Sequence, residues 1–164
     1  MGEDLTLPDT PEAMDFLEQQ MLAGGDHLVE LPVIHRFTPS LYAREIFMPA
    51  GTLLTSRIHQ TEHPYVVISG VAKVYIPGVG IERLEAGHVG ITQPGTRRLL
   101  LIEEDCRWIT FHPLVEGESS EADLGAIEAR IIERRELGDG RTAFEQYSAL
   151  LAEAKQAGLL PGGD

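Results

Sequence analysis

The stretch from Pro49 to Gly70 decides the fold, and it reads PAGTLLTSRIHQTEHPYVVISG. It begins with a Pro/Gly turn, continues through a run rich in Thr and Leu, and closes with Tyr-Val-Val-Ile before a glycine. Runs of this kind between Gly and Pro are typical of β-strands. His59 and His63 lie between the two runs, and imidazoles on strands can converge on one cavity. The stretch therefore predicts β-structure that carries a binding site.

The histidine pair also allows a helical interpretation. The run from His59 to His63 also fits the H-x-x-E-H pattern of inverted zinc proteases. That pattern requires a helix, but Pro64 follows directly and the flanking runs favour strands. The β interpretation is therefore preferred.

The regions outside this stretch predict the rest of the architecture. From residue 28 to about 112, short β-type runs recur between Gly and Pro turns at the spacing of a sandwich or barrel. Thr10-Pro11-Glu12 is typical of a helix start, and residues 116–164 hold two amphipathic helical patterns. We expect three segments: an N-terminal helical segment (1–27), a β-barrel (28–115) and a C-terminal helical hairpin packed on the barrel (116–164).

Composition limits the partners and the compartment. The net charge of -13 over 164 residues argues against non-specific binding of nucleic acid or of an anionic membrane. The single cysteine, Cys106, forbids an internal disulfide and fits a reducing compartment. The acidic first seven residues do not resemble a signal peptide, and no run approaches the roughly 20 apolar residues that span a bilayer. We expect a cytoplasmic protein.

The glycine and histidine spacing resembles the first motif of the cupin superfamily, which is a small β-barrel or jelly roll. That motif runs from a glycine to H-x-H, then to a glutamate three or four residues on, and to a glycine seven residues beyond the glutamate. Counting back from Gly70 places His63 at the glutamate position, His59 at the second histidine and Arg57 at the first.

The second cupin motif is a glycine, five residues, P-x-G, two residues and a histidine. Gly87 to Arg98 has this spacing, with Gln93-Pro94-Gly95 at the P-x-G and Arg98 at the histidine. The resemblance covers roughly residues 41–112. It implies a mainly β fold, a cupin-type β-barrel (jelly roll), whose mouth binds a metal ion or a small ligand.

Two of the four usual metal positions hold arginine, and only His59 retains its residue. Arginine does not ligate metals but binds carboxylate or phosphate, often through two hydrogen bonds. Arg57 and Arg98 are therefore predicted to bind a small anionic ligand, beside a metal or in place of one. The alternative for Arg98 is a solvated turn.

A third metal ligand is expected at His112, which ends the run Trp108-Ile109-Thr110-Phe111. A hairpin would bring His112 across from Arg98 and toward the same mouth. His59, His63 and His112 would form a set suited to Zn, Fe, Ni or Mn. His88 is a weaker candidate, and the alternative is that hydrogen bonds alone satisfy the histidines.

The strings MPAGTLLTSRIHQTEHP, GITQPGTRR and TFHP also resemble small cupin-like proteins encoded in phage and prophage genomes. That group implies a genomic setting and no activity. The expected function is a cupin-like protein that binds a metal ion, a small anion or both. The alternative is a non-catalytic structural or assembly protein, such as a phage virion component that contacts other phage proteins. The sequence names no convincing general base and specifies no reaction.

The resemblance implies a homo-oligomer, with a dimer as the default, because cupin barrels often pair through sheet edges. Open edge strands would otherwise pair without control. The N-terminal helix would complete such an interface.

Overall fold

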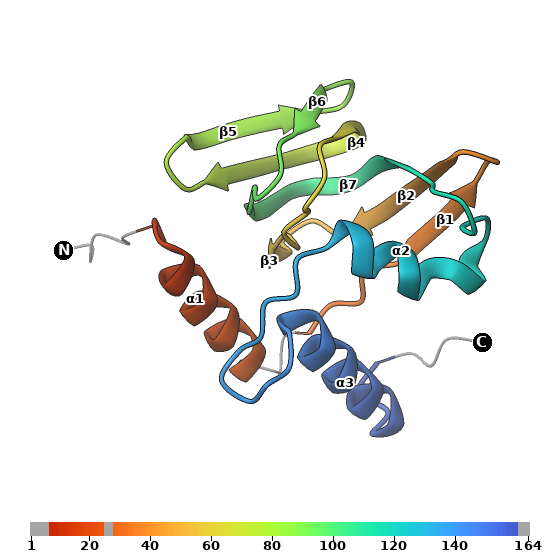
Figure 1. Cartoon of the computed structure of the whole chain (residues 1–164). Coiled ribbons are helices and arrows are strands. Elements are labelled where there is room, and N and C mark those ends of the chain that lie inside the picture. Colours follow the sequence, from red (N-terminus) through yellow and green to blue (C-terminus); the bar gives the residue numbers. More distant parts are fainter. Residues whose placement is uncertain (1–6, 25–27, 161–164) are drawn as a thin grey trace. The chain divides into compact units, whose positions relative to one another are not determined.

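The computed structural model describes residues 7–24 and 28–160, and Figure 1 shows the elements along the chain. The chain forms two compact units, one of residues 31–134 and one that combines residues 1–30 with residues 135–164. The first unit holds the sheet and helix α2, and the second holds helices α1 and α3. None of the helices among the described residues has the length and apolar character that a bilayer crossing requires.

The sheet unit contains seven antiparallel strands. In space the main order is β1-β2-β7-β4-β5, with β3 paired to β7 and β6 paired to β4. Their bounds are β1 (Val33–Phe37), β2 (Leu41–Met48), β3 (Leu53–Thr55), β4 (His63–Ile76), β5 (Gly80–Glu85), β6 (Val89–Thr92) and β7 (Leu99–Pro113).

The two long strands wrap the sheet around an interior. The first part of β4 pairs with β6 and its second part with β5, while the two ends of β7 pair with β3 and β2. Register shifts interrupt the β4–β7 pairing near Gly70, which adopts a φ of 85°. A Cβ at Gly70 would lie 2.0 Å from the carbonyl oxygen of Asp105, so only glycine fits this bulge.

Two apolar clusters fill the sheet unit. The larger cluster lies between the strands and includes Val67, Ile102 and Trp108. The smaller cluster packs Tyr42 against Ile127 and Ile131 of α2 (Leu124–Ile131). A 3₁₀ turn over Glu121–Asp123 precedes α2 and carries a capping box from Ser120 to Asp123. Helix α2 therefore covers the sheet near Tyr42.

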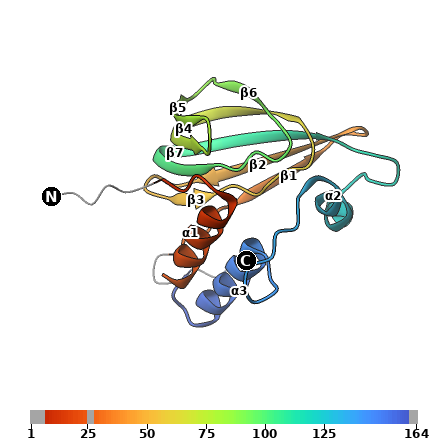
Figure 2. The same cartoon turned by 60° about the vertical axis from the view of Figure 1, so that its left-hand side comes forward.

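In the second unit, α1 (Pro11–Ala23) packs with α3 (Ala143–Gln156). Thr10 caps α1 by accepting a hydrogen bond from the amide of Ala13 at 3.1 Å. Thr142 and Glu145 cap α3 reciprocally, with bonds of 2.8 and 3.1 Å. Figure 2 shows both helices from a second direction.

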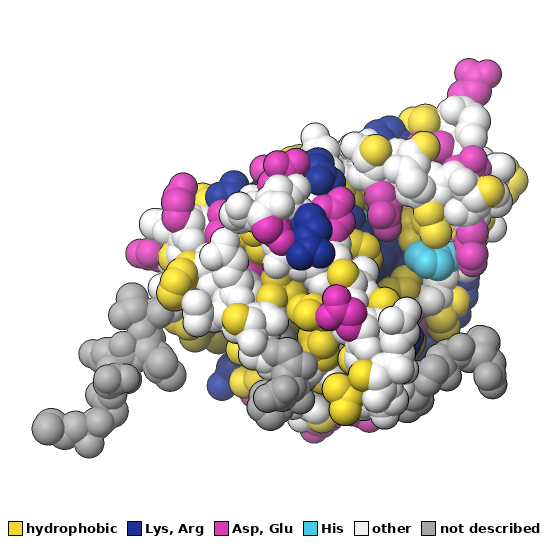
Figure 3. All heavy atoms as spheres, turned by 90° about the horizontal axis from the view of Figure 1, so that it is seen from below, with side chains coloured by type: hydrophobic (Ala, Val, Ile, Leu, Met, Phe, Trp, Pro, Cys, Tyr) yellow, Lys and Arg dark blue, Asp and Glu magenta, His cyan; other side chains and the backbone are white. Residues whose placement is uncertain are grey.

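The mainly β fold of cupin type, with one N-terminal helix and helices at the C-terminal end, is confirmed by the wrapped antiparallel pairing and the element order. The two C-terminal helices are present, but α2 belongs to the sheet unit and α3 to the other. The three-segment division with boundaries at 27 and 115 stays a prediction. On the face in Figure 3, acidic side chains lie scattered among basic and hydrophobic ones.

Candidate metal centre

Three histidines meet inside the sheet unit. One ligand nitrogen from each of His59, His63 and His112 lies within 4.8 Å of the others. The ring centroids are 4.4 Å apart for His59 and His63, 4.5 Å for His63 and His112, and 5.2 Å for His59 and His112. The structure thus brings together the three side chains that the sequence proposed as metal ligands.

Strand pairing positions two of these histidines. His63 is the first residue of β4 and pairs with Thr92 of β6. His112 is the penultimate residue of β7 and pairs with Tyr42 of β2. Because directly opposite residues of an antiparallel pair share a face, His112 and Tyr42 both face the interior, with ring centroids 5.9 Å apart.

A short extended segment after α2 positions the third histidine. His59 forms an isolated antiparallel bridge with Ile132. On either side of it, the amide of Gln60 donates to the carbonyl of Ile131 at 2.7 Å, and the amide of Glu133 donates to the carbonyl of Ile58 at 2.8 Å. There is no helix around His59 and His63, so the structure supports the β interpretation over the inverted zinc-protease pattern.

Hydrogen bonds fix the orientation of two of the rings. Nδ1 of His63 donates to the carbonyl of Thr61 at 3.0 Å, which leaves the lone pair of Nε2 available. Nε2 of His112 bonds the hydroxyl of Thr110 at 2.9 Å. Nδ1 of His112 is buried and has no hydrogen-bond partner among the described residues. Hydrogen bonds within the described part of the chain therefore leave one nitrogen of this cluster unsatisfied, and such a nitrogen can bind a ligand.

The cluster favours neutral imidazoles. Burial, together with the neighbouring histidines, lowers the pKa of His59 and of His112 to about 3. Burial also lowers the pKa of His63. A metal ion binds the neutral form of imidazole, so at neutral pH no proton has to leave before binding.

The two arginines predicted to bind an anion lie in different surroundings. Arg98 is buried, donates to the hydroxyl of Thr92 at 3.1 Å and stacks over the ring of Tyr65 at 5.0 Å. Burial lowers its pKa. Arg57 instead pairs with Glu128 of α2 at 3.3 Å, so an anion would have to compete with that carboxylate.

Sequence reasoning missed Arg44. It lies on β2 two residues from Tyr42 and directly opposite Thr110, and it therefore faces the interior. Its charge helps to lower the pKa of both His59 and His112, while burial lowers its own pKa. Within the described ranges, no carboxylate pairs with Arg44 and no acceptor hydrogen-bonds it. The sequence signal that could have identified Arg44 is a charged residue at a position of an alternating strand that is expected to face the interior.

The remaining histidines lie outside the cluster. His88 hydrogen-bonds the hydroxyl of Tyr65 at 3.0 Å through Nε2. His35 bonds the hydroxyl of Tyr42 at 2.6 Å through Nδ1. His27, which the sequence gave no binding role, lies outside the described residues.

No protein-family model and no curated protein matches the chain. Similar solved structures include the DMSP lyase DddQ from Ruegeria pomeroyi DSS-3, at 18% identity and a TM-score of 0.47 over 58% of this chain and 52% of that one. An RmlC-like cupin family protein with a double-stranded β-helix fold from Methanocaldococcus jannaschii matches at 10% identity, TM-score 0.44, over 51% and 80% of the two chains. The EutQ protein of Clostridium difficile matches at 17% identity, TM-score 0.43, over 52% and 64%. The matched part spans about half the length of the lyase. The strand pairings described above, and not these likenesses, define the fold of this chain.

Proposed function

We propose that the sheet unit binds a divalent transition-metal ion through His59, His63 and His112, together with a small anionic ligand. The observation that carries this proposal is the convergence of three neutral imidazoles, one of which holds a buried nitrogen without a partner. Three histidines with other positions left open are a usual donor set for Zn, Fe, Ni or Mn.

Residues around the cluster prepare the imidazoles for this role. The carbonyl of Thr61 and the hydroxyl of Thr110 each hold the far nitrogen of one ring, which orients the near nitrogen toward the shared space. The residues present therefore fit a metal ion. When bound, such an ion would polarise an oxygen ligand as a Lewis acid.

Arg44 supports the second half of the proposal. Its guanidinium adds a positive charge beside His59 and His112, and no described acid neutralises it at ion-pair distance. A carboxylate or phosphate beside the metal position would give the Arg44 guanidinium an ion-pair partner. Arg44 thus replaces Arg57, which Glu128 already engages, as the first candidate for holding the anion.

The test is elemental analysis of untagged protein after loading with zinc and removal of excess metal. We expect about one zinc ion per chain in the wild type and its loss in the double variant His59→Ala, His63→Ala. His35→Ala is the matched control, because this histidine bonds Tyr42 and is not a member of the cluster. Circular dichroism of each variant confirms folding. Zinc retained by the folded double variant, or absent from the loaded wild type, would contradict the proposal.

The other expected properties remain proposals of the sequence. They are the homodimer, the cytoplasmic location and the role as a phage assembly component. Light scattering on the purified chain distinguishes the dimer from the assembly role. A defined large ring or shell would favour assembly, and a dimer would favour the ligand-binding barrel.

A further inference from the structure

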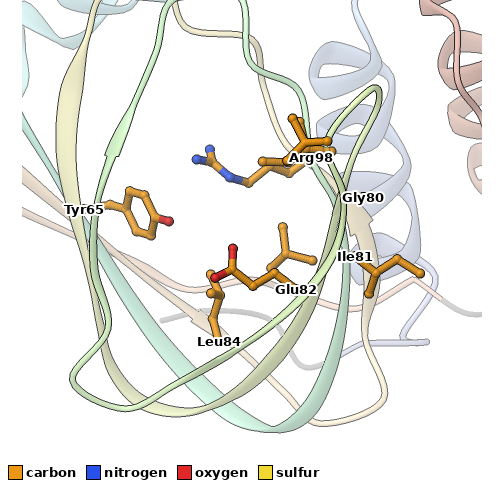
Figure 4. A pocket seen from close by; sticks show the side chains of 9 residues that line it. Tyr65, Gly80, Ile81, Glu82, Leu84 and Arg98 are labelled. Carbon is orange, nitrogen blue, oxygen red and sulfur yellow. The ribbon is translucent and has the colours of Figure 1, made fainter.

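A pocket of about 240 Å³ opens between β4, β5 and the start of β7 (Figure 4). Its walls are apolar side chains of β4 and β5, such as Val74 and Leu84. Three polar groups interrupt these walls: the hydroxyl of Tyr65, the carboxylate of Glu82 and the guanidinium of Arg98. None of the three clustered histidines lines it, although the charge of Arg98 reaches His63 of the proposed metal centre.

Arg98 supplies a positive charge to this pocket. Only 9% of its surface is exposed, and it contacts the hydroxyl of Thr92 and both the ring and the hydroxyl of Tyr65. No carboxylate in the described part of the chain lies within ion-pair distance of it. These contacts do not use all five N–H donors of the guanidinium, so donors remain available for an anionic group.

Glu82 supplies a negative charge to the same pocket. It pairs with Val74 across β4 and β5 and lies two residues before buried Leu84, so its side chain, although exposed, is on the face of β5 that lines the pocket. Figure 4 shows its carboxylate directed into the pocket toward Tyr65 and Arg98. Among the residues that the structure describes, no partner hydrogen-bonds or ion-pairs with Glu82.

The neighbouring charged residues of β5, unlike Glu82, form ion pairs. Arg83 pairs with both Glu85 and Glu103 on the outer side of the sheet. Glu82 and Arg98 thus have opposite charges, face one pocket and do not pair with each other. The pocket of about 240 Å³ would hold about eight waters at roughly 30 Å³ each, so only a small ligand fits into it.

We propose that this pocket binds a small dipolar molecule, with a carboxylate held by Arg98 and a cationic group held by Glu82. An amino acid of fewer than about ten non-hydrogen atoms has this chemistry and fits the volume. The apolar walls contact the chain that joins the two charged groups, and the hydroxyl of Tyr65 adds a hydrogen bond.

The experiment compares matched ligand pairs by calorimetry. Glycine, β-alanine, 4-aminobutyrate and 5-aminopentanoate span increasing separations between the two charges. Acetate, propionate, butyrate and pentanoate match them without the ammonium group. We expect at least one amino acid to bind wild type about 10-fold more tightly than its matched carboxylate, which corresponds to about 1.4 kcal/mol.

Variants assign this preference to the two side chains. Glu82→Gln should remove the preference for the amino acid and keep carboxylate binding, whereas Arg98→Gln should weaken both. Glu104→Gln is the matched control, because Glu104 is exposed on β7 and does not line the pocket. If no amino acid in the series binds wild type more tightly than its matched carboxylate, or if Glu82→Gln leaves the preference intact, the proposal is wrong.

The same titrations on the His59→Ala, His63→Ala variant separate this inference from the metal proposal. A dipolar preference that persists there establishes the pocket whether or not zinc binds. Zinc binding without any preference for the amino acid over its matched carboxylate would support the metal proposal and contradict the proposal for the pocket.

Discussion

Arg44 and Glu45 are neighbours on β2, but their side chains lie on opposite faces of the strand, and only Glu45 has ion-pair partners among the described residues. Glu45 is 2% exposed and lies beneath two arginines, with Arg36 of β1 at 2.8 Å and Arg107 of β7 on its other oxygen. Arg44 faces the interior beside three histidines and has no hydrogen-bond or ion-pair partner within the described ranges.

The difference separates a charge that bonds within the fold satisfy from a charge that we propose binds a ligand. The Glu45 carboxylate ties three adjacent strands together, so its burial is compensated by bonds within the chain. Nδ1 of His112 is buried without a hydrogen-bond partner among the described residues, and the Arg44 guanidinium, whose pKa burial lowers, has no ion-pair partner there. A native fold retains such groups where binding requires them, at a cost in stability.

The largest expected effect comes from filling space on the interior face. Gly90 of β6 lies opposite Tyr65, and a Cβ at Gly90 would approach the phenol ring to 2.5 Å. The ring cannot move freely, because it stacks on Trp108 at 4.7 Å and lies under Arg98. We expect Gly90→Ala to lower the free energy of unfolding by about 2 kcal/mol, measured by urea denaturation.

The matched control is Gly125→Ala on α2. Gly125 is exposed, and nothing lies within 4 Å of a Cβ built there. Because alanine favours a helix over glycine, this substitution should raise the free energy of unfolding by up to about 1 kcal/mol. Equal effects of the two substitutions would show that the interior face is not tightly filled.

The next effect tests the two neighbours directly. Glu45→Gln leaves two arginines without their carboxylate and should lower the free energy of unfolding by about 1–2 kcal/mol, since both arginines are half exposed. Arg44→Met removes an unpaired charge at similar volume and should raise that free energy by about 1 kcal/mol in metal-free protein. Chemical denaturation of both variants measures these changes in the free energy of unfolding. A loss in Arg44→Met as large as in Glu45→Gln would assign Arg44 to the fold.

The smallest effect is a pH dependence. Hydrogen bonds from Arg36 and Arg107 hold the pKa of Glu45 below its ordinary value of 4.5. The unfolded chain therefore takes up the proton first as the pH falls, so the contribution of Glu45 is complete above about pH 4.5 and is lost as the pH drops through the folded value. The difference in unfolding free energy between wild type and Glu45→Gln should narrow as the pH falls below about 4.5. The buried histidines affect both proteins alike, and a constant difference would contradict the assignment.

Much of the fold was readable from local signals. The turns around Pro49 and Gly70, the alternating runs and the cap at Thr10 correctly predicted strands and a helix start. The spacing of His59 and His63, with His112 at the end of a strand, also named the three side chains that converge.

The rest depends on contacts between distant segments, which a sequence does not display. Arg57 pairs with Glu128, 71 residues away, and therefore does not offer a free guanidinium. Arg44 was overlooked because its inward direction follows from its register with Thr110 of β7. Glu82 carries no motif, and the pairing of β4 with β5 is what places it beside Arg98, which the sequence had assigned only to the metal-binding mouth.

The extended segment after α2 has a consequence for ligand binding. Backbone bonds from residues 131–133 to residues 58–60 hold His59, and one residue beyond Glu133 the sheet unit ends at Arg134. A ligand on His59 would thus stabilise the pairing of residues 58–60 with residues 131–133. By thermodynamic linkage, any change that loosens this pairing would weaken the ligand by the same free energy.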